Sequence, residues 1–244
     1  MSREEIASRL EGLRRRIAAA AERADRRPQE VTLVGVAKRQ PASAVCAAVA
    51  AGLTHVGESY VQEDLAKRPE VERALREAGV SPPRWHFIGR LQRNKARHVA
   101  ARFDVVETLD REALGEELDR RAGAAGRRLD VLLQVDVADE PQKGGAPPQA
   151  LPALLDRSRR WSALRVAGLM AIPPATDHPE RSRPAFARLR ELRDALREAP
   201  GGDTLHALSM GMSADFEVAI EEGATIVRVG TALFGARDAA GGDA

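Results

Sequence analysis

Cysteine, lysine and aromatic residues are the scarce components of this 244-residue sequence. Its single cysteine, Cys46, excludes an internal disulfide framework and a zinc site built from a cluster of cysteines. A chain without disulfides suits a reducing compartment, so we expect a cytoplasmic protein. Cys46 lies in an alanine-rich stretch, where we expect a small buried hydrophobic residue.

Long apolar runs are absent as well. No run approaches the roughly 18 residues needed to span a bilayer, and the first ten residues, with two acids and no apolar core, do not resemble a secretory signal. Aromatic residues make up 3%, and 38 basic side chains face 36 acidic ones, for a net charge of +2. These features favour neither a membrane nor a nucleic acid as partner. The 43% of hydrophobic residues is typical of a soluble globular protein.

Lysine occurs only at positions 38, 67, 95 and 143, so arginine supplies 34 of the 38 basic side chains. The chain therefore uses arginine for generic surface charge. A lysine in an apolar setting then calls for its own explanation, because arginine cannot deprotonate to act as an amine nucleophile.

Short apolar segments alternate with amphipathic ones along the whole sequence. The apolar segments predict strands at 31–37, 55–57, 85–88, 104–108, 129–135, 166–171, 205–209 and 225–229. The amphipathic segments predict helices at 2–26, 42–51, from about 60, 93–102, 111–122, 151–160, 184–198 and 214–222.

Eight buried strands that alternate with helices predict a single (β/α)8 TIM barrel with an extra N-terminal helix. A doubly wound open sheet is the alternative, but the first strand lacks the Gly-x-Gly-x-x-Gly turn of dinucleotide-binding folds. We expect one domain over 1–237 and a flexible tail over 238–244.

In barrels of this kind the active site lies at the carboxyl ends of the strands. Lys38 directly follows the first predicted strand. Desolvation at the mouth of a packed barrel lowers the pKa of an amine, and a neutral amine can form a Schiff base with an aldehyde. The alternative is a lysine whose ammonium reaches out to solvent from a strand end. The same positional argument selects Glu58, Ser59, His86, Gln134, Met170, Ser209, Arg228, Gly230 and Thr231.

The segments after the last two strands are candidates for binding a phosphate. Backbone N–H groups at a helix start attract anions, and glycine lets a phosphate approach the backbone. Ser209, Ser213 and Thr231 could add hydroxyl donors beside Gly230. The alternative is that Ser213 only caps a helix and Gly230 only forms a turn.

Strand eight of a closed barrel lies beside strand one, so the amine and the phosphate loops are expected to be neighbours. A ligand with both an aldehyde and a phosphate is pyridoxal 5′-phosphate (PLP). A ketose phosphate, as in Schiff-base aldolases, fits the same two features.

Several motifs resemble those of the pyridoxal phosphate homeostasis proteins, a family similar to the N-terminal barrel domain of alanine racemase. They are VAK at 36–38, HVGESYVQE at 55–63, WHFIG at 85–89, LQRNK at 91–95, GLMA at 168–171, LSMGMS at 208–213 and VRVGTALFG at 227–235. The resemblance implies that Lys38 carries PLP as a Schiff base.

The resemblance also implies roles for other residues. Arg228 would face the pyridine nitrogen, keep it unprotonated and so weaken the ring as an electron sink. Ser59 stands where the family usually has asparagine, which puts a polar contact to the cofactor in doubt. Ser209, Ser213, Gly230 and Thr231 would hold the phosphate, and Met170 and His86 would line the pocket.

Other chemistry-bearing residues have plainer interpretations. His86 is also compatible with a hydrogen-bonded core histidine, and the remaining histidines lack metal-ligand spacing. Lys67 reads as an ordinary charge on a helix surface, and solvated charge is the default for Lys95 and Lys143, although either could contact an anion or receive the cofactor. The sequence does not decide whether the acidic residues Glu58, Glu63, Asp110 and Asp136 orient pocket groups or face solvent.

Three functions remain open. The first is a PLP carrier in vitamin B6 and amino-acid homeostasis without strong catalysis, a monomer that could supply PLP-dependent apoenzymes. The second is an alanine-racemase-like enzyme, which needs an acid/base group on each face of the substrate; the one tyrosine, Tyr60, follows strand two, and we expect no second domain to supply another. The third is a Schiff-base aldolase acting on a sugar phosphate.

Overall fold

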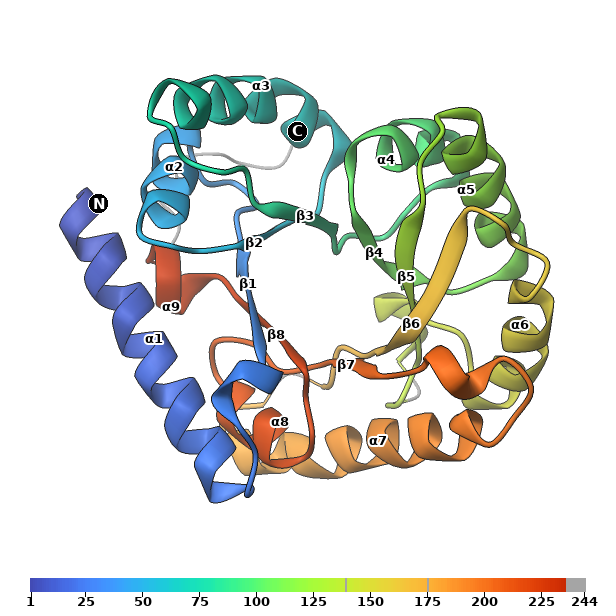
Figure 1. Ribbon diagram of the computed structural model, residues 1–244. Helices are drawn as coiled ribbons and strands as arrows, with labels where there is room; N and C mark the ends of the chain where they lie inside the picture. Colours follow the sequence, from blue (N-terminus) through green and yellow to red (C-terminus); the bar gives the residue numbers. More distant parts are fainter. Residues whose placement is uncertain (139, 175, 236–244) are drawn as a thin grey trace.

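The computed structural model describes residues 1–138, 140–174 and 176–235, and the predicted tail at 238–244 lies outside them. Eight parallel strands form a closed barrel in sequence order, which confirms the TIM barrel and rules out the open sheet (Figure 1). The strands are β1 (Thr32–Val36), β2 (His55–Glu58), β3 (Arg84–Phe87), β4 (Val105–Leu109), β5 (Leu129–Gln134), β6 (Leu164–Met170), β7 (Ala207–Ser209) and β8 (Ile226–Val229).

Helices surround the barrel on the outside (Figure 1). They are α1 (Arg3–Arg23), α2 (Ala42–Ala50), α3 (Val61–Glu77), α4 (Ala96–Arg102), α5 (Glu112–Ala124), α6 (Leu151–Ser158), α7 (Arg183–Arg197), α8 (Phe216–Glu221) and α9 (Thr231–Phe234). In the extra N-terminal helix α1, Ser2 and Glu5 form a capping box as their spacing predicts.

Two element boundaries near the candidate site differ from the prediction. The strand predicted at 205–209 begins at Ala207, because Gly202–Thr204 forms a 3-10 turn before it. The helix predicted from 214 begins at Phe216, because the Asp215 carboxylate accepts a hydrogen bond from the Met212 backbone N–H at 2.7 Å and closes a turn there. The loop after β7 is therefore longer than expected and leaves Ser213 and Ala214 outside the helix.

The barrel is closed by pairing of β1 with β8. Val34 pairs with Arg228 and Gly35 pairs with Val229, so the carboxyl ends of these two strands lie side by side. Gly35 faces outward with no space for a side chain, because an added Cβ would come within 2.6 Å of the Leu53 side chain. This close packing holds together the two strand ends that carry the candidate site.

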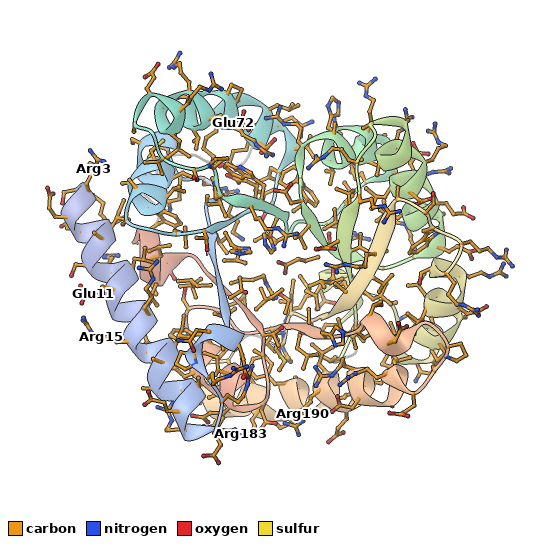
Figure 2. All side chains as sticks on the ribbon, viewed as in Figure 1. Arg3, Glu11, Arg15, Glu72, Arg183 and Arg190 are labelled. Atoms are coloured by element: carbon orange, nitrogen blue, oxygen red, sulfur yellow. The ribbon has the colours of Figure 1, made fainter. Side chains whose placement is uncertain are left out.

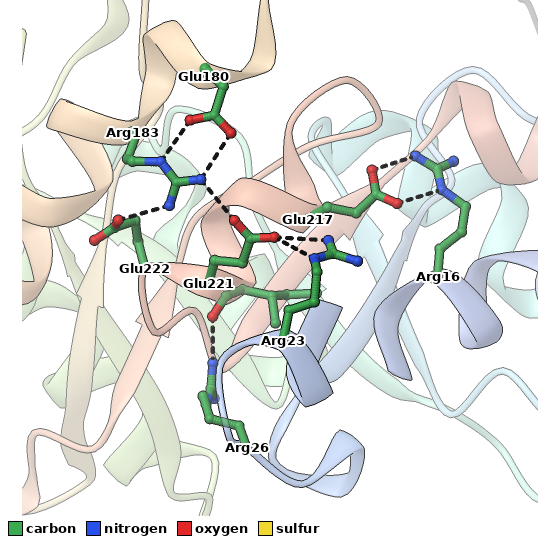
Figure 3. A network of polar contacts seen from close by, with 9 residues as sticks. Arg16, Arg23, Arg26, Glu180, Arg183, Glu217, Glu221 and Glu222 are labelled. Carbon is green, nitrogen blue, oxygen red and sulfur yellow. Dashed lines mark hydrogen bonds and ion pairs between the residues drawn. The ribbon is translucent and has the colours of Figure 1, made fainter. Parts of the chain in front are cut away.

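Charged side chains cover the outer faces of the helices (Figure 2). An ion-pair network ties α1 to α8 and to the start of α7: Arg16 binds Glu217, Arg23 binds Glu221, and Arg183 binds Glu180, Glu221 and Glu222 (Figure 3). A shared network of this kind stabilises more than isolated surface pairs. It fixes α8, which directly follows the loop predicted to bind phosphate.

Candidate functional site

Lys38 lies just beyond β1, in the turn from Ala37 to Gln40, and is half-buried. It borders a cavity of about 280 Å³ at the carboxyl ends of the strands. The cavity is lined by Val36, Lys38, Gln40, Met212, Ser213, Ala214, Arg228, Gly230, Thr231 and Gly235. The structure thus brings together five of the predicted site residues, namely Lys38, Ser213, Arg228, Gly230 and Thr231.

One side of this cavity offers backbone donors. No described residue accepts a hydrogen bond from the backbone N–H of Ser213, Ala214 or Thr231. The Ser213 hydroxyl accepts a bond from the Ala232 N–H at 3.3 Å, which joins the loop after β7 to the start of α9. Amides left without protein acceptors beside a cationic side chain attract an anion. Ser213 therefore does not cap the helix that follows it, as the alternative expected, but bonds to the first turn of α9.

Arg228 extends from β8 beneath the cavity and is 4% exposed. Its guanidinium donates to the Ser209 hydroxyl at 2.6 Å and to the Ala171 carbonyl at 3.0 Å. Burial lowers the pKa of Arg228, while the nearby carboxylate of Glu107 opposes that effect. Ser209 is fully buried and does not border the cavity, so its hydroxyl holds Arg228 in place.

Glu107 is the functional residue that the sequence reasoning missed. It is fully buried and accepts hydrogen bonds of 2.6 Å from Ser209 and from His86 Nδ1. Burial raises the pKa of Glu107, but the bonds from His86 and Ser209 and the charge of Arg228 outweigh burial and leave that pKa below its usual value. Glu107 is therefore the buried countercharge of Arg228.

His86 continues this chain into the barrel. Its Nε2 lies 2.9 Å from Nδ1 of His55, and desolvation lowers the pKa of His55 to about 4. A carboxylate only accepts hydrogen bonds, so His86 donates from Nδ1 to Glu107 and shares a second hydrogen bond with His55 through Nε2. His86 is 2% exposed and does not border the Lys38 cavity, which matches the core-histidine interpretation.

Lys67 corrects a prediction. It was expected on a helix surface, yet it is 8% exposed because α3 packs over the turn that carries Lys38. Its ammonium lies 2.7 Å from Glu58 and donates to Glu63 at 2.8 Å. It also donates to the carbonyls of Ala37 at 2.7 Å and Gln40 at 2.9 Å, on either side of Lys38. Glu58 and Glu63 thus belong to the support of the site.

The remaining predicted residues lie apart from the Lys38 cavity. Met170 is fully buried at the end of β6, and Ser59 borders a separate cavity of about 660 Å³ together with Tyr60 and Lys95. Lys143 ion-pairs with Glu140 and donates to the Pro173 carbonyl at 2.9 Å, so it is not simply solvated.

Three further residues complete this picture. The Gln134 side chain donates to the Lys143 carbonyl at 2.9 Å, and Asp136 accepts from the backbone of the following loop. Cys46 is only half-buried, rather than buried as expected. Within the described ranges, no cluster of histidine, cysteine and acidic side chains could hold a metal ion, and no helix is long and apolar enough to cross a membrane.

Glu58 supplies a pH-dependent prediction. Burial raises the pKa of Glu58 from 4.5 to about 7, more than the Lys67 ammonium lowers it. Between these pH values the folded protein keeps a proton that the unfolded chain releases, so this group's stabilisation is lost as the pH rises. Glu58→Gln removes the titration.

We therefore expect the unfolding free energy of Glu58→Gln, relative to the wild type, to increase by about 3 kcal/mol from pH 4 to pH 8. Urea unfolding at several pH values measures this difference. Glu77→Gln, at an exposed position of α3, should show no such trend. A constant difference for Glu58→Gln would mean that the pKa of Glu58 is the same in the folded protein as in the unfolded chain.

A closed eight-stranded barrel with a lysine at the end of β1 places the protein in the class of barrels that resemble the N-terminal domain of alanine racemase. The family of the alanine racemase N-terminal domain matches residues 9–238. The chain is 45% identical over 233 residues to the pyridoxal phosphate homeostasis protein of Pseudomonas aeruginosa, with 96% of each chain covered. It is 43% identical to the protein of that name from Aquifex aeolicus, over 94% of this chain and 97% of the relative.

The chain belongs to the pyridoxal phosphate homeostasis protein family, as its motifs predict. Among solved structures, PipY of Synechococcus elongatus with PLP bound matches it with a TM-score of 0.82 and 37% identity, covering 94% of this chain and 100% of that chain.

Proposed function

We propose that this protein binds pyridoxal 5′-phosphate in the cavity beside Lys38 and serves PLP homeostasis as a carrier. The observation that carries the proposal is the juxtaposition, in one cavity, of the Lys38 amine with the backbone amides of Ser213, Ala214 and Thr231, to which no described residue offers an acceptor. The amine can react with an aldehyde at one end of a ligand, and the backbone amides can bind a phosphate at its other end. The PLP bound by PipY, which is 37% identical, supports the same assignment.

The residues present fit this group. Lys38 would hold it through a Schiff base, and the loop after β7 with Gly230 and Thr231 would hold its phosphate. Arg228 would lie opposite the pyridine nitrogen, and the apolar side chains of Val36 and Met212 would contact the ring. When bound, PLP supplies an electrophilic aldehyde and a conjugated ring. Ser209 and Glu107 act on it only through Arg228, because neither borders the cavity.

The residues that line the cavity favour a PLP carrier over a racemase. Racemisation needs a proton carrier on each face of the substrate. Beside Lys38 and the always-charged Arg228, the described lining contains no histidine, tyrosine, cysteine or carboxylate. Tyr60 is 48% exposed and borders the other cavity. Robust conversion of an L-amino acid to its D form would overturn this choice.

Absorption spectroscopy and peptide mapping test the binding proposal. Purified protein mixed with PLP should turn yellow, and borohydride should fix the group on the peptide containing Lys38. The chain has only four lysines, far apart in the sequence, so the modified peptide identifies the lysine that carries the group. No colour and no adduct would refute the proposal. A colourless protein that instead forms a reducible adduct with a ketose phosphate would favour the aldolase.

The wider role follows from the same proposal. The carrier would work in the cytoplasm as a monomer within one barrel domain at 1–237 and deliver PLP to PLP-dependent apoenzymes. The loaded protein should reactivate such an apoenzyme faster than the same concentration of free PLP does. Equal rates would leave storage, rather than delivery, as the function.

A further inference from the structure

The turn that presents Lys38 has a backbone that is costly for its sequence. Gln40 N–H bonds to the Ala37 carbonyl at 3.0 Å, which makes Lys38 and Arg39 the two central residues of a β-turn. Arg39 has φ 60, in the left-handed region that the third position of a type II turn usually gives to glycine or asparagine. Such a conformation persists in a non-glycine residue only where surrounding contacts impose it.

The contacts that impose it come from α3. The Lys67 ammonium donates to the carbonyls of Ala37 and Gln40, the first and last residues of the turn. Glu63, one helical turn before Lys67, accepts the Arg39 backbone N–H and the Lys67 ammonium on the same carboxylate oxygen. Helix α3 thus holds the backbone of Ala37, Arg39 and Gln40, while the Ala37 N–H bonds to the Gly57 carbonyl of β2 at 2.9 Å.

The Lys67 ammonium also lies next to acidic side chains. Glu58, fully buried at the end of β2, lies 2.7 Å from Lys67, and no described residue hydrogen-bonds to its second carboxylate oxygen. The acidic side chains of Glu58 and Glu63 offset the cost of burying the Lys67 ammonium, and an ammonium forms stronger hydrogen bonds with carbonyls than a neutral donor does. Lysine is rare in this chain, yet one of its four lysines occupies this position.

We propose that Lys67 is a positioning residue for Lys38: with Glu63 it clamps the strained 37–40 turn and so directs the Lys38 amine into the cavity. The clamp touches only the backbone on either side of Lys38, so its effect on the amine is indirect. Its relevance to cofactor loading depends on the proposed function, whereas its effect on the turn does not.

The test compares Lys67→Met with Lys67→Arg, which keeps the charge and a set of donors. Arg73→Met, at an exposed position of α3, is the matched control for removing a cation from this helix. Two readouts use the protein without PLP: amide hydrogen exchange in the peptide covering 37–40, and the rate at which an amine-reactive anhydride labels Lys38. The third readout is the absorbance titration with PLP.

We expect Lys67→Met to speed exchange in the turn, to change the labelling rate of Lys38 and to weaken PLP loading roughly tenfold, with the far-UV spectrum unchanged. Lys67→Arg should recover part of each effect, and Arg73→Met should show none. Unchanged exchange and labelling in folded Lys67→Met would overturn the clamp.

A second variant guards against failure to fold. Glu63→Gln leaves Lys67 and Glu58 in place but weakens the acceptor for the Arg39 N–H, and it lies nearer the surface. It should speed exchange at the turn to a smaller degree, and wild-type exchange there would count against the proposal. If wild-type protein takes up no PLP on Lys38 while the turn still loosens in both variants, the proposed function fails and the clamp stands.

Discussion

Replacing Glu107 with leucine is expected to lower the free energy of unfolding by about 3–5 kcal/mol, the usual loss when one partner of a buried ion pair is removed. Arg228 is 4% exposed, and its nearest carboxylate oxygen is that of Glu107 at 3.8 Å. Without Glu107 the guanidinium would keep its bonds to Ser209 and Ala171 but would remain charged inside the barrel, with only the weaker attraction of Asp215 to compensate it.

The variant Glu107→Gln separates the effect of losing the negative charge from the effect of changing the side-chain shape. It preserves the volume and one acceptor oxygen but not the negative charge, so we expect a smaller loss than for leucine. Glu116→Gln, on the exposed face of α5, should change stability by no more than about 0.5 kcal/mol. Urea unfolding at neutral pH measures all three. A loss below about 1 kcal/mol for Glu107→Leu would show that Arg228 does not depend on Glu107 for charge compensation.

The same substitution bears on function through the position of Arg228. The guanidinium borders the cavity, whereas Ser209, Glu107 and His86 form a hydrogen-bonded chain away from it. If this chain fixes Arg228, folded Glu107→Gln should bind PLP more weakly and show a shifted visible absorption maximum. An unchanged spectrum would mean that the Ser209 hydroxyl and the Ala171 carbonyl hold Arg228 in place without Glu107.

The barrel and the two ends of the Lys38 cavity could be predicted because they depend on local patterns. The eight apolar segments are short and regularly spaced, and a closed parallel barrel then places Lys38 beside Gly230 and Thr231. Boundaries such as the start of α8 were wrong by two residues, because the Asp215 side chain redirects the loop through a bond to the Met212 backbone.

The support of the site could not be predicted in the same way, since it depends on contacts distant in sequence. Glu107 bonds to Ser209, 102 residues away, and Lys67 reaches back 30 residues to the Ala37 carbonyl. Helical periodicity alone placed Lys67 on a surface. Two local signals were available: an acid inside the apolar 104–108 segment needs a buried partner, and Glu63 with Lys67 forms an i,i+4 pair near the Lys38 strand end.

Lys38→Arg is expected to abolish the reducible adduct at position 38 while leaving the fold intact. Arginine is cationic and slightly longer than lysine, but its guanidinium does not deprotonate to provide a neutral amine. The side chain is half-buried at the edge of the cavity, so we expect the unfolding free energy to change by no more than about 1 kcal/mol. The substitution therefore separates covalent attachment from the binding of the phosphate.

The phosphate subsite should survive in Lys38→Arg, because Ser213, Ala214 and Thr231 contribute backbone groups there. We expect this variant to bind PLP weakly, without the visible band of a Schiff base, and mass spectrometry after borohydride should find no adduct on the peptide around position 38. Lys95→Arg, in the other cavity, should keep wild-type colour. An adduct that moves to Lys95 or Lys143 would show that the cavity concentrates PLP without selecting its lysine. A full wild-type spectrum in Lys38→Arg would remove Lys38 from the mechanism altogether.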